Sequence, residues 1–410
     1  MSRGVAKRKT LRGRVAIVGA GLAGAACAAA LARRGEAVVL LEAESTAGRH
    51  SSGRNAGLVR QAVEDPVTAR LCLEGARAIR ARLIGGVEIP FRPSGSILID
   101  PIGSIPPEVW APLDSREVSP DAVIARLPWL AGCALENAIE TRDDGIVEVH
   151  ALLEAYLAEV RDHGGEIRFG EPALRPLIDS GAVVGVLTTR DELAVEALVI
   201  ATGAWGAEWG ERGGAPIALT PTRRSLIQTT CDERNGDPPA TDVRTTQPER
   251  PDDGPWVWHL DEGWYFRFEA GGMLWCAGEE LSDTPGDARP DPLAPDRLAE
   301  VAARHLPAVR GWNPVRHWAG HRTFCPDRRF LLGPDPRVAG WHWAVGLGGH
   351  GVTTSFAVGE RVANAIVWST ADGLEPELAF RDAVLPASPG DPVPLSVRTG
   401  LVEVPRKEPR

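Results

Sequence analysis

The sequence predicts an α/β fold in which a parallel sheet is combined with a second domain built on an antiparallel sheet. Segment 15–42 follows the order strand, glycine turn, helix, strand. Its continuous apolar runs at 15–18 and 38–41 are typical of parallel strands buried on both faces. From residue 223 to about 268 the pattern changes to alternating, aromatic-rich strands, which indicates an antiparallel sheet. A chain of 410 residues is expected to form two domains.

The remaining elements follow from periodicity and from turn residues. We expect helices at 22–33, 60–83, 150–161 and 295–305, strands at 166–169, 182–189, 197–201, 330–332 and 342–345, and a glycine turn at 346 that opens a helix. An acidic, proline-rich insert at 232–255 is expected to form a loop or lid, and the proline-rich tail 386–410 to run over the surface.

Composition excludes several classes of function. The formal net charge of −10 argues against nucleic acid or an anionic membrane as the main partner. No run of 18 apolar residues is present, so no transmembrane segment is expected. The basic N-terminus leads directly into the first strand rather than into a signal-peptide cleavage region, so a cytoplasmic enzyme is the expectation. The six cysteines have no metal-binding spacing, so we expect free thiols and no metal site.

The first glycine turn carries a dinucleotide-binding pattern. In VAIVGAGLAGAACAAAL (15–31), Gly19 permits the tight turn, Gly21 lets the backbone approach a pyrophosphate, and Gly24 allows close packing of helix on strand. Glu42 ends the next strand, where a carboxylate accepts hydrogen bonds from a ribose diol. The same turn also places Ala20, Leu22 and Ala23 beside the nucleotide. This motif does not separate NAD from FAD.

Three further segments resemble the D-amino acid oxidase-type (DAO) superfamily of FAD-dependent oxidoreductases: AESTAGRHSSGRNAGLVR (43–60), ATGAW (201–205) and GLGGHGVTTS (346–355). The blocks RHSSGRNAG, TPTRRSL, LDEGWYFRFEAGGMLW and WAGHRTF are most similar to D-arginine dehydrogenase-like and glycine/sarcosine oxidase-like members. The resemblance implies a Rossmann-like FAD-binding domain. It adds as cofactor-binding residues Ala43, Arg49, His50, Ser51, Ser52, Gly53, Arg54, Asn55, Ala56, Ala173, Thr202, Gly203, Trp205, Gly348, Gly349, His350, Gly351, Val352 and Thr353.

The resemblance also implies a carboxylate-binding arginine. Arg322, in WAGHRTF, matches the family residue that holds the substrate carboxylate, and a planar guanidinium binds a carboxylate through two parallel bonds. Each such charge-assisted bond is worth roughly 1.5–3 kcal/mol. Arg223 or Arg224 is the second candidate, because the sequence does not show which side chain points inward. Tyr265 matches a position that closes the pocket over the carboxylate, although it could also be an ordinary sheet aromatic.

Three more positions have weaker matches. His50 matches a histidine beside the flavin, which orients the substrate amine, helps to remove its proton, or only bonds a backbone carbonyl. His350, between two glycines, is expected to contribute its backbone to the cofactor. Glu88, in GGVEIPFRPSG, falls where D-arginine dehydrogenase-like enzymes place an acid against basic substrate side chains.

Two departures from related enzymes limit the chemistry. Lysine occurs only at Lys7, Lys9 and Lys407, so the oxygen-activating lysine of some sarcosine oxidase relatives has no counterpart here. Some relatives link the flavin covalently to histidine or cysteine, but Cys325 and His50 are out of register with those positions. We therefore expect non-covalent FAD.

The resulting hypothesis is a discontinuous FAD-binding domain and a substrate domain. We assign 14–85, 146–222 and 320–385 to the former and 86–145 and 223–319 to the latter. The implied activity is oxidation of the Cα–N bond of an amino acid, with a D-amino acid favoured, and the electron acceptor is left open between oxygen, a quinone and another carrier. Two alternatives remain: oxidation of a secondary amine such as an N-methyl amino acid, opine or proline-like substrate, and a flavoprotein subunit with structural FAD.

Overall fold

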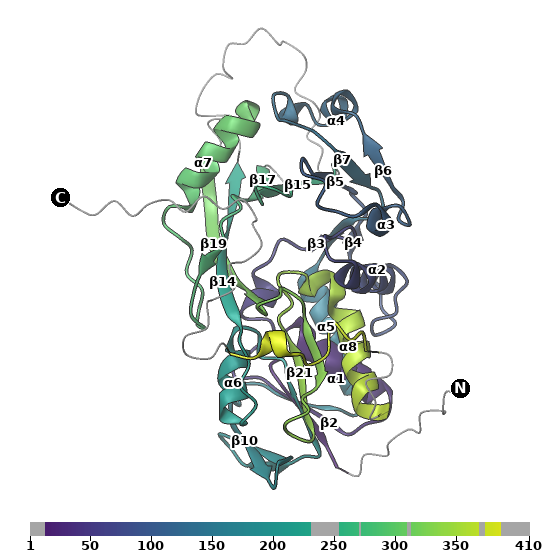
Figure 1. Ribbon diagram of the computed structural model, residues 1–410, viewed down its shortest axis with the longest axis vertical. Helices are drawn as coiled ribbons and strands as arrows, with labels where there is room; N and C mark the ends of the chain where they lie inside the picture. The colour runs from purple at the N-terminus through teal and green to yellow at the C-terminus, as the bar shows by residue number, and fades with distance from the viewer. Residues whose placement is uncertain (1–12, 231–253, 270–271, 310–312, 369–373, 387–410) are drawn as a thin grey trace, which may run out of the picture.

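A computed structural model describes residues 13–230, 254–269, 272–309, 313–368 and 374–386. Almost all of the insert expected at 232–255 and nearly all of the tail expected after residue 385 lie outside these ranges. The described chain forms two parts stacked along the long axis of the molecule (Figure 1). One part contains the parallel sheet, and the other contains the antiparallel sheet.

The first part is built on a sheet whose strands come from the beginning, middle and end of the chain. Its order is β20 (Leu331–Pro334), β21 (Trp341–Val345), β13 (Ala197–Ile200), β1 (Val15–Val18), β2 (Val38–Leu41) and β9 (Glu166–Arg168). All neighbours pair in parallel except β20 and β21. The sequence-based strands at 15–18 and 38–41 are confirmed to the residue.

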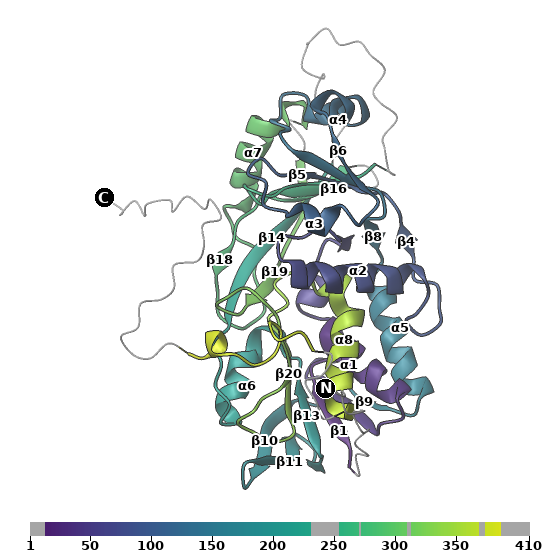
Figure 2. The ribbon, with the colours of Figure 1, turned by 45° about the vertical axis from the view of Figure 1, so that its right-hand side comes forward.

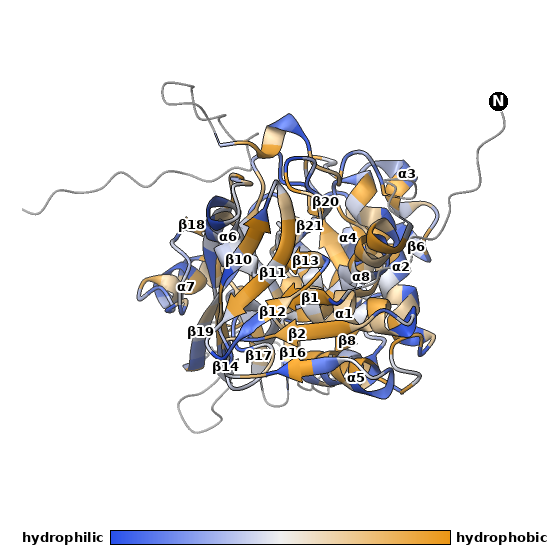
Figure 3. Ribbon diagram, turned by 90° about the horizontal axis from the view of Figure 1, so that it is seen from below, coloured by the Kyte–Doolittle hydropathy of each residue, from blue (hydrophilic) through white to orange (hydrophobic). Residues whose placement is uncertain are grey.

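Helices cover one face of this sheet: α1 (Leu22–Arg33), α5 (Val149–Asp162) and α8 (Gly351–Trp368). The opposite face is covered by α6 (Gly206–Arg212) and by a small antiparallel sheet of β10 (Ala173–Asp179), β11 (Ala182–Thr188) and β12 (Glu192–Ala194). The strands between these layers are apolar on both faces, and Figure 3 shows them in orange at the centre of the molecule.

The second part is a largely antiparallel sheet. Its order is β18 (Leu281–Ser282), β14 (Thr220–Thr230), β17 (Gly272–Cys276), β16 (Tyr265–Glu269), β15 (Trp256–His259), β5 (Ser96–Ile99), β7 (Ala138–Thr141) and β6 (Ser115–Val118), with β19 (Asn313–Phe324) also paired to β14. Among the described residues of this second sheet, only strands β15 and β5 pair in parallel. The long strands β14 and β19 run from the parallel-sheet part towards α7 (Ala294–His305) (Figure 1). They therefore connect the two parts directly.

The helix expected at 60–83 is shorter in the structure. Helix α2 covers Pro66–Arg80, and the short strand β3 (Leu58–Val59) precedes it. Proline suits the first helical turn, and the Asp65 carboxylate caps the helix by accepting a bond from the Thr68 backbone N–H. The start signal was therefore present in the sequence. Helix α2 crosses beside α8 at the junction of the two parts (Figure 2).

The described residues contain neither a membrane-spanning helix nor a metal-binding cluster. No helix there is long and apolar enough to cross a membrane. No group of three or more His, Cys, Asp or Glu side chains there is arranged to hold a metal ion.

Candidate active site

A cavity of about 990 Å³ lies where the carboxyl ends of the parallel strands meet the long strands of the second sheet. This edge of an open α/β sheet is the usual place for a ligand, and the volume is at the upper end of the range for ligand pockets. Most predicted cofactor residues line it: Gly19, Gly21, Leu22, Ala23, Glu42, Ala43, Arg49, His50, Ser51, Ser52, Arg54, Asn55, Ala56, Ala173, Thr202, Gly203, Trp205, Gly348, Gly349, His350, Gly351, Val352 and Thr353. Ala20, Gly24 and Gly53 do not.

The glycine turn after β1 is held by backbone contacts that larger residues would prevent. Gly19 has φ +101°, and a Cβ there would lie 2.7 Å from the Ala201 carbonyl oxygen. A Cβ on Gly24 would lie 1.9 Å from the Gly19 carbonyl oxygen, so Gly24 serves packing of helix on turn. The Glu42 carboxylate accepts a 2.7 Å bond from the Ala20 N–H. Ala20 and Gly24 thus support the turn from behind the cavity wall.

The serine-rich segment folds against the start of α1. The Ser52 hydroxyl accepts a 3.0 Å bond from the Leu22 N–H, at the first residue of the helix. Gly53 turns away from the cavity, because a Cβ there would lie 2.3 Å from the Gly48 carbonyl oxygen. The Asn55 side chain closes the turn by donating to the Ser52 carbonyl oxygen. Small residues are therefore needed for the tight fold of this segment as well as for access to the cavity.

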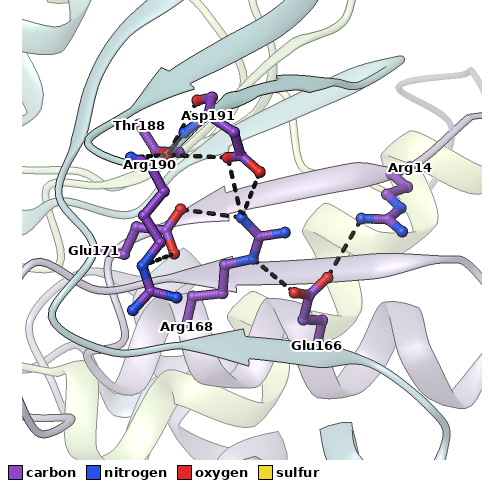
Figure 4. Close-up of polar contacts among 7 residues, drawn as sticks. All are labelled: Arg14, Glu166, Arg168, Glu171, Thr188, Arg190 and Asp191. Atoms are coloured by element: carbon purple, nitrogen blue, oxygen red, sulfur yellow. Dashed lines mark hydrogen bonds and ion pairs between the residues drawn. The ribbon is translucent and has the colours of Figure 1, made fainter.

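An ion-pair network supports the Glu42 end of the cavity. Figure 4 shows Arg168 between the carboxylates of Glu166, Glu171 and Asp191, at 2.7, 3.0 and 3.2 Å. Glu171 is fully buried. The backbone of the same segment pairs with that of Glu42, which donates to the Arg168 carbonyl and accepts from the Glu171 N–H. The network therefore fixes the main chain that carries Glu42.

The described residues fit FAD. Two buried polar atoms of cavity-lining residues have no partner within the described part of the chain: the Thr202 hydroxyl and the Nδ1 atom of His50. The other ring nitrogen of His50 lies 3.0 Å from Glu44, and the ring packs edge-on against Trp205. Unpaired buried polar atoms are uncommon unless a ligand or water satisfies them. Together with the glycine turns and the size of the cavity, they indicate an extended polar cofactor.

Arg322 lies at the other end of the cavity, on β19. Its guanidinium carbon is 5.4 Å from the centre of the Trp258 ring and 5.9 Å from that of Tyr265. The turn before α8 passes close to it, because a Cβ on Gly349 would lie 2.7 Å from Arg322 Nε. Burial and the charge of Arg224 lower the pKa of Arg322. Burial raises the pKa of Tyr265, so its hydroxyl keeps its proton.

The two arginines of the RRS block lie on opposite faces of β14, as alternation in a strand requires. Arg224 pairs with Gly320 across the sheet and lines the cavity on the same face as Arg322. Arg223 does not line the cavity, and its guanidinium lies 3.8 Å from Asp283. The structure therefore places Arg224, not Arg223, at the site.

Glu88 is not at the site, so its predicted contact with a basic substrate side chain is wrong. Its side chain is 73% exposed and pairs with Arg82. It follows the surface turn at Gly85 and Gly86, both in the left-handed region of φ. The match rested on a loose alignment, and Glu88 does not line the cavity.

Several cavity residues were not predicted, among them Arg60, Trp258, Glu280 and Arg328. Arg60 lies 4.8 Å from the Trp258 ring and bonds Glu64 at 3.1 Å. Glu280 and Arg328 are 3.2 Å apart beside Arg322. Trp258 could have been found from the alternating pattern of strand 256–259. No pattern in the sequence indicates that Glu280 lies in the cavity. These residues come from loops and strand ends whose approach depends on the tertiary fold.

Comparisons with known proteins show the family to which the chain belongs. The DAO family, described as FAD dependent oxidoreductase, matches residues 14–365. Glycine oxidase of Pseudomonas aeruginosa is 26% identical over 80% of this chain and 87% of that protein. The bifunctional protein MnmC of Polaromonas naphthalenivorans, involved in tRNA 5-methylaminomethyl-2-thiouridine biosynthesis, is 28% identical over 91% of this chain, which spans 59% of that protein.

A solved structure supports the fold. The L-proline dehydrogenase of P. horikoshii superposes with a TM-score of 0.74 at 20% identity, covering 88% of this chain and 95% of that one. The family match spans both parts of the molecule and the cavity between them. The chain belongs to the DAO family of FAD-dependent oxidoreductases.

Proposed function

We propose that this protein oxidises the Cα–N bond of an amino acid whose α-carboxylate is bound by Arg322. The observation that carries the proposal is the absence of hydrogen bonds from the Arg322 guanidinium to the described part of the chain. Arg322 lies in the cavity, yet its guanidinium makes no hydrogen bond to the described part of the chain, and its nearest acid, Glu280, is 3.9 Å away. A buried guanidinium with free donors is a binding site for a planar anion.

The surrounding residues orient the bound acid group. Trp258 and Tyr265 flank the guanidinium and limit its rotation, and the protonated Tyr265 hydroxyl would donate to the carboxylate in exchange for its contact with Cys276. Fixing the carboxylate in this way fixes the position of the Cα–H bond.

FAD, when bound, supplies the redox chemistry by taking the hydride from Cα at its N5 atom. The substrate nitrogen reacts as the neutral amine, and the imino acid product is hydrolysed by water to a 2-oxo acid and ammonia. The proposal includes non-covalent FAD, because Cys325 and His50 are out of register with the covalent attachment positions of relatives. It also includes a preference for D-amino acids, because RHSSGRNAG and WAGHRTF resemble D-arginine dehydrogenase-like enzymes.

Anaerobic addition of D-, L- and N-methyl amino acids to the FAD-loaded protein tests this proposal. At least one member of the panel is expected to bleach the flavin absorbance. Reduction by N-methyl or proline-like compounds alone would instead favour the secondary-amine alternative. If no amino compound reduces the flavin, the proposed reaction is wrong.

The Arg322→Ala variant separates an enzyme from a protein with structural FAD. The enzyme is expected to lose substrate affinity while keeping its flavin, since Arg322 lies at the far end of the cavity from the dinucleotide turn. Arg175→Ala is the matched control, because Arg175 is exposed on β10 and does not line the cavity. Unchanged function in Arg322→Ala would favour structural FAD.

A further inference from the structure

Three guanidiniums share one carboxylate at the substrate end of the cavity. Glu280 Oε1 lies 3.1 Å from Arg224 and 3.9 Å from Arg322, and its Oε2 lies 3.2 Å from Arg328. All four residues line the cavity. The three neighbouring arginines lower the pKa of Glu280 although burial opposes them, so it is ionised. A second buried carboxylate, Glu279, also acts on Arg224 through its charge, so Glu280 is left between the guanidiniums of Arg322 and Arg328.

The donors of Arg224 are already used within the protein. Its guanidinium donates to the carbonyl oxygens of Glu279 and Gly278, each at 3.1 Å, as well as to Glu280. It therefore anchors the segment that carries Glu280. Arg224 contributes charge to the cavity but has few donors left for a ligand.

Arg328 is placed differently. Its guanidinium lies 3.9 Å from the centre of the Phe324 ring, makes one hydrogen bond to Glu280 within the described chain, and is 44% exposed at the cavity rim. Its backbone has φ +62°, a conformation that favours glycine. Bulky residues adopt it at a cost and are often found there at functional sites. Both the side chain and the backbone therefore point to a role for arginine at this position.

Two other carboxylates near the cluster are paired with basic side chains. Arg60 is balanced by Glu64. Glu262 is paired with Arg304 and His305 at the turn after β15. Asp261, on the same turn, also lines the cavity, and its charge acts on His259.

His350 lines the cavity, and the charged side chains around it affect its pKa. Burial, and then the charges of Arg60, Arg322 and Arg328, lower its pKa, although Glu64 opposes them. The imidazole is therefore neutral at pH 7.

We propose that the substrate is a short amino dicarboxylate, with its α-carboxylate on Arg322 and its second acid group on Arg328. The two guanidiniums contact opposite oxygens of the same Glu280 carboxylate, so one short molecule can reach both. A monocarboxylate leaves unused the Arg328 donors that do not bond Glu280, whereas the second acid group of a dicarboxylate binds them. This inference rests on the proposed function and replaces the basic side chain that Glu88 had suggested.

Substrate pairs that differ only in charge test the inference. Aspartate and glutamate, as both enantiomers, are compared with asparagine and glutamine as reductants of the anaerobic flavoprotein. Removing one charge-assisted bond is expected to cost roughly 10-fold to 100-fold in kcat/KM, so the acids should exceed their amides by that factor. If the amides reduce the flavin as well as the acids, the inference is overturned while the proposed function survives.

A binding measurement keeps the inference testable without turnover. Succinate and its monoamide succinamate are titrated against the flavin absorbance spectrum. Succinate should bind about 10-fold or more tightly than succinamate. Equal dissociation constants would overturn the inference. Failure of every amino compound to reduce the flavin, with succinate still preferred, would count against the proposed function instead.

The variant Arg328→Gly removes the charge while suiting the left-handed backbone, so it is expected to fold at least as well as the wild type. It should lose the preference for succinate over succinamate and raise KM for the acidic substrates more than it lowers kcat. Arg328→Lys should restore part of the preference, and Arg175→Ala should leave it unchanged. If Arg328→Gly keeps the wild-type preference for succinate over succinamate, another residue causes that preference and the proposed role of Arg328 is wrong.

Discussion

The Arg322 guanidinium carbon lies 5.9 Å from the centre of the Tyr265 ring, and the two residues come from different strands of the antiparallel sheet. The same guanidinium faces Trp258 at 5.4 Å. A cation over an aromatic face is stabilised and its orientation is restricted. The aromatic pair therefore holds the guanidinium plane for a bidentate contact with a carboxylate.

Replacement of Arg322 by lysine tests the need for that plane. Lysine keeps the positive charge but provides only a point contact. We expect kcat/KM to fall by about 10-fold or more, because one charge-assisted bond is lost, with the flavin content unchanged. Steady-state kinetics measure the effect, and activity equal to the wild type would argue against a bidentate carboxylate site.

Replacement of Tyr265 by phenylalanine separates the ring from its hydroxyl. The ring contacts with Arg322 and Trp258 should persist. Loss of one hydrogen bond to a charged group predicts an increase in KM of roughly 10-fold or more, with a smaller change in kcat. A variant with unaltered KM would show that the tyrosine serves only as a packed aromatic.

Gly24→Ala tests the packing of the dinucleotide turn. The new Cβ would lie 1.9 Å from the Gly19 carbonyl oxygen, so either the helix or the turn must move. We expect a loss on the order of 3 kcal/mol in the free energy of unfolding, together with loss of bound flavin. Gly286→Ala is the control, because its nearest neighbouring atom is 4.0 Å away and its φ is not positive. Similar denaturation midpoints for the two variants would contradict the packing argument.

The buried carboxyl group of Asp144 is expected to make the free energy of unfolding depend on pH. It is buried and accepts bonds from Gln61 and Ser96, and burial raises its pKa to about 6 from 3.8. A raised pKa in the folded state means that its stabilising contribution is complete below about pH 4 and is lost as pH rises through about 6. Urea denaturation should therefore show wild-type stability falling relative to Asp144→Asn across this window. Parallel curves for the two proteins would rule out this titration.

The flavin is expected to dissociate on denaturation. Cys325 is buried behind the glycine turn, where a Cβ on Gly346 would lie 2.8 Å from its sulfur, and it does not line the cavity. Burial raises the pKa of Cys325 to about 12, so its thiol is protonated. After acid precipitation the yellow colour should remain in the supernatant. A yellow pellet with a flavin-linked peptide would contradict non-covalent binding.

The sequence was most informative where local rules decide the structure. Strands 15–18 and 38–41 and helix 22–33 were predicted to the residue, because apolar runs and the glycine turn define them. The start of helix α2 was missed, although Asp65 and Pro66 form a recognisable start signal. Periodicity alone extended this helix too far towards the N-terminus.

The candidate site was harder to predict, since its residues meet only in the folded chain. Strand alternation shows that just one of Arg223 and Arg224 can face the cavity, but the choice requires the pairing of β14 with β19. Glu280 and Arg328 lie at opposite ends of a stretch of 49 residues, and no motif joins them. Their pairing depends on tertiary structure that local patterns do not encode.

The most direct test is a crystal structure of the purified protein with FAD and an unreactive carboxylic acid bound. The account predicts a yellow protein in which the ligand carboxylate lies within hydrogen-bond distance of the Arg322 guanidinium, beside the isoalloxazine ring. A protein that binds no flavin, or a ligand bound away from Arg322, would contradict the proposed site.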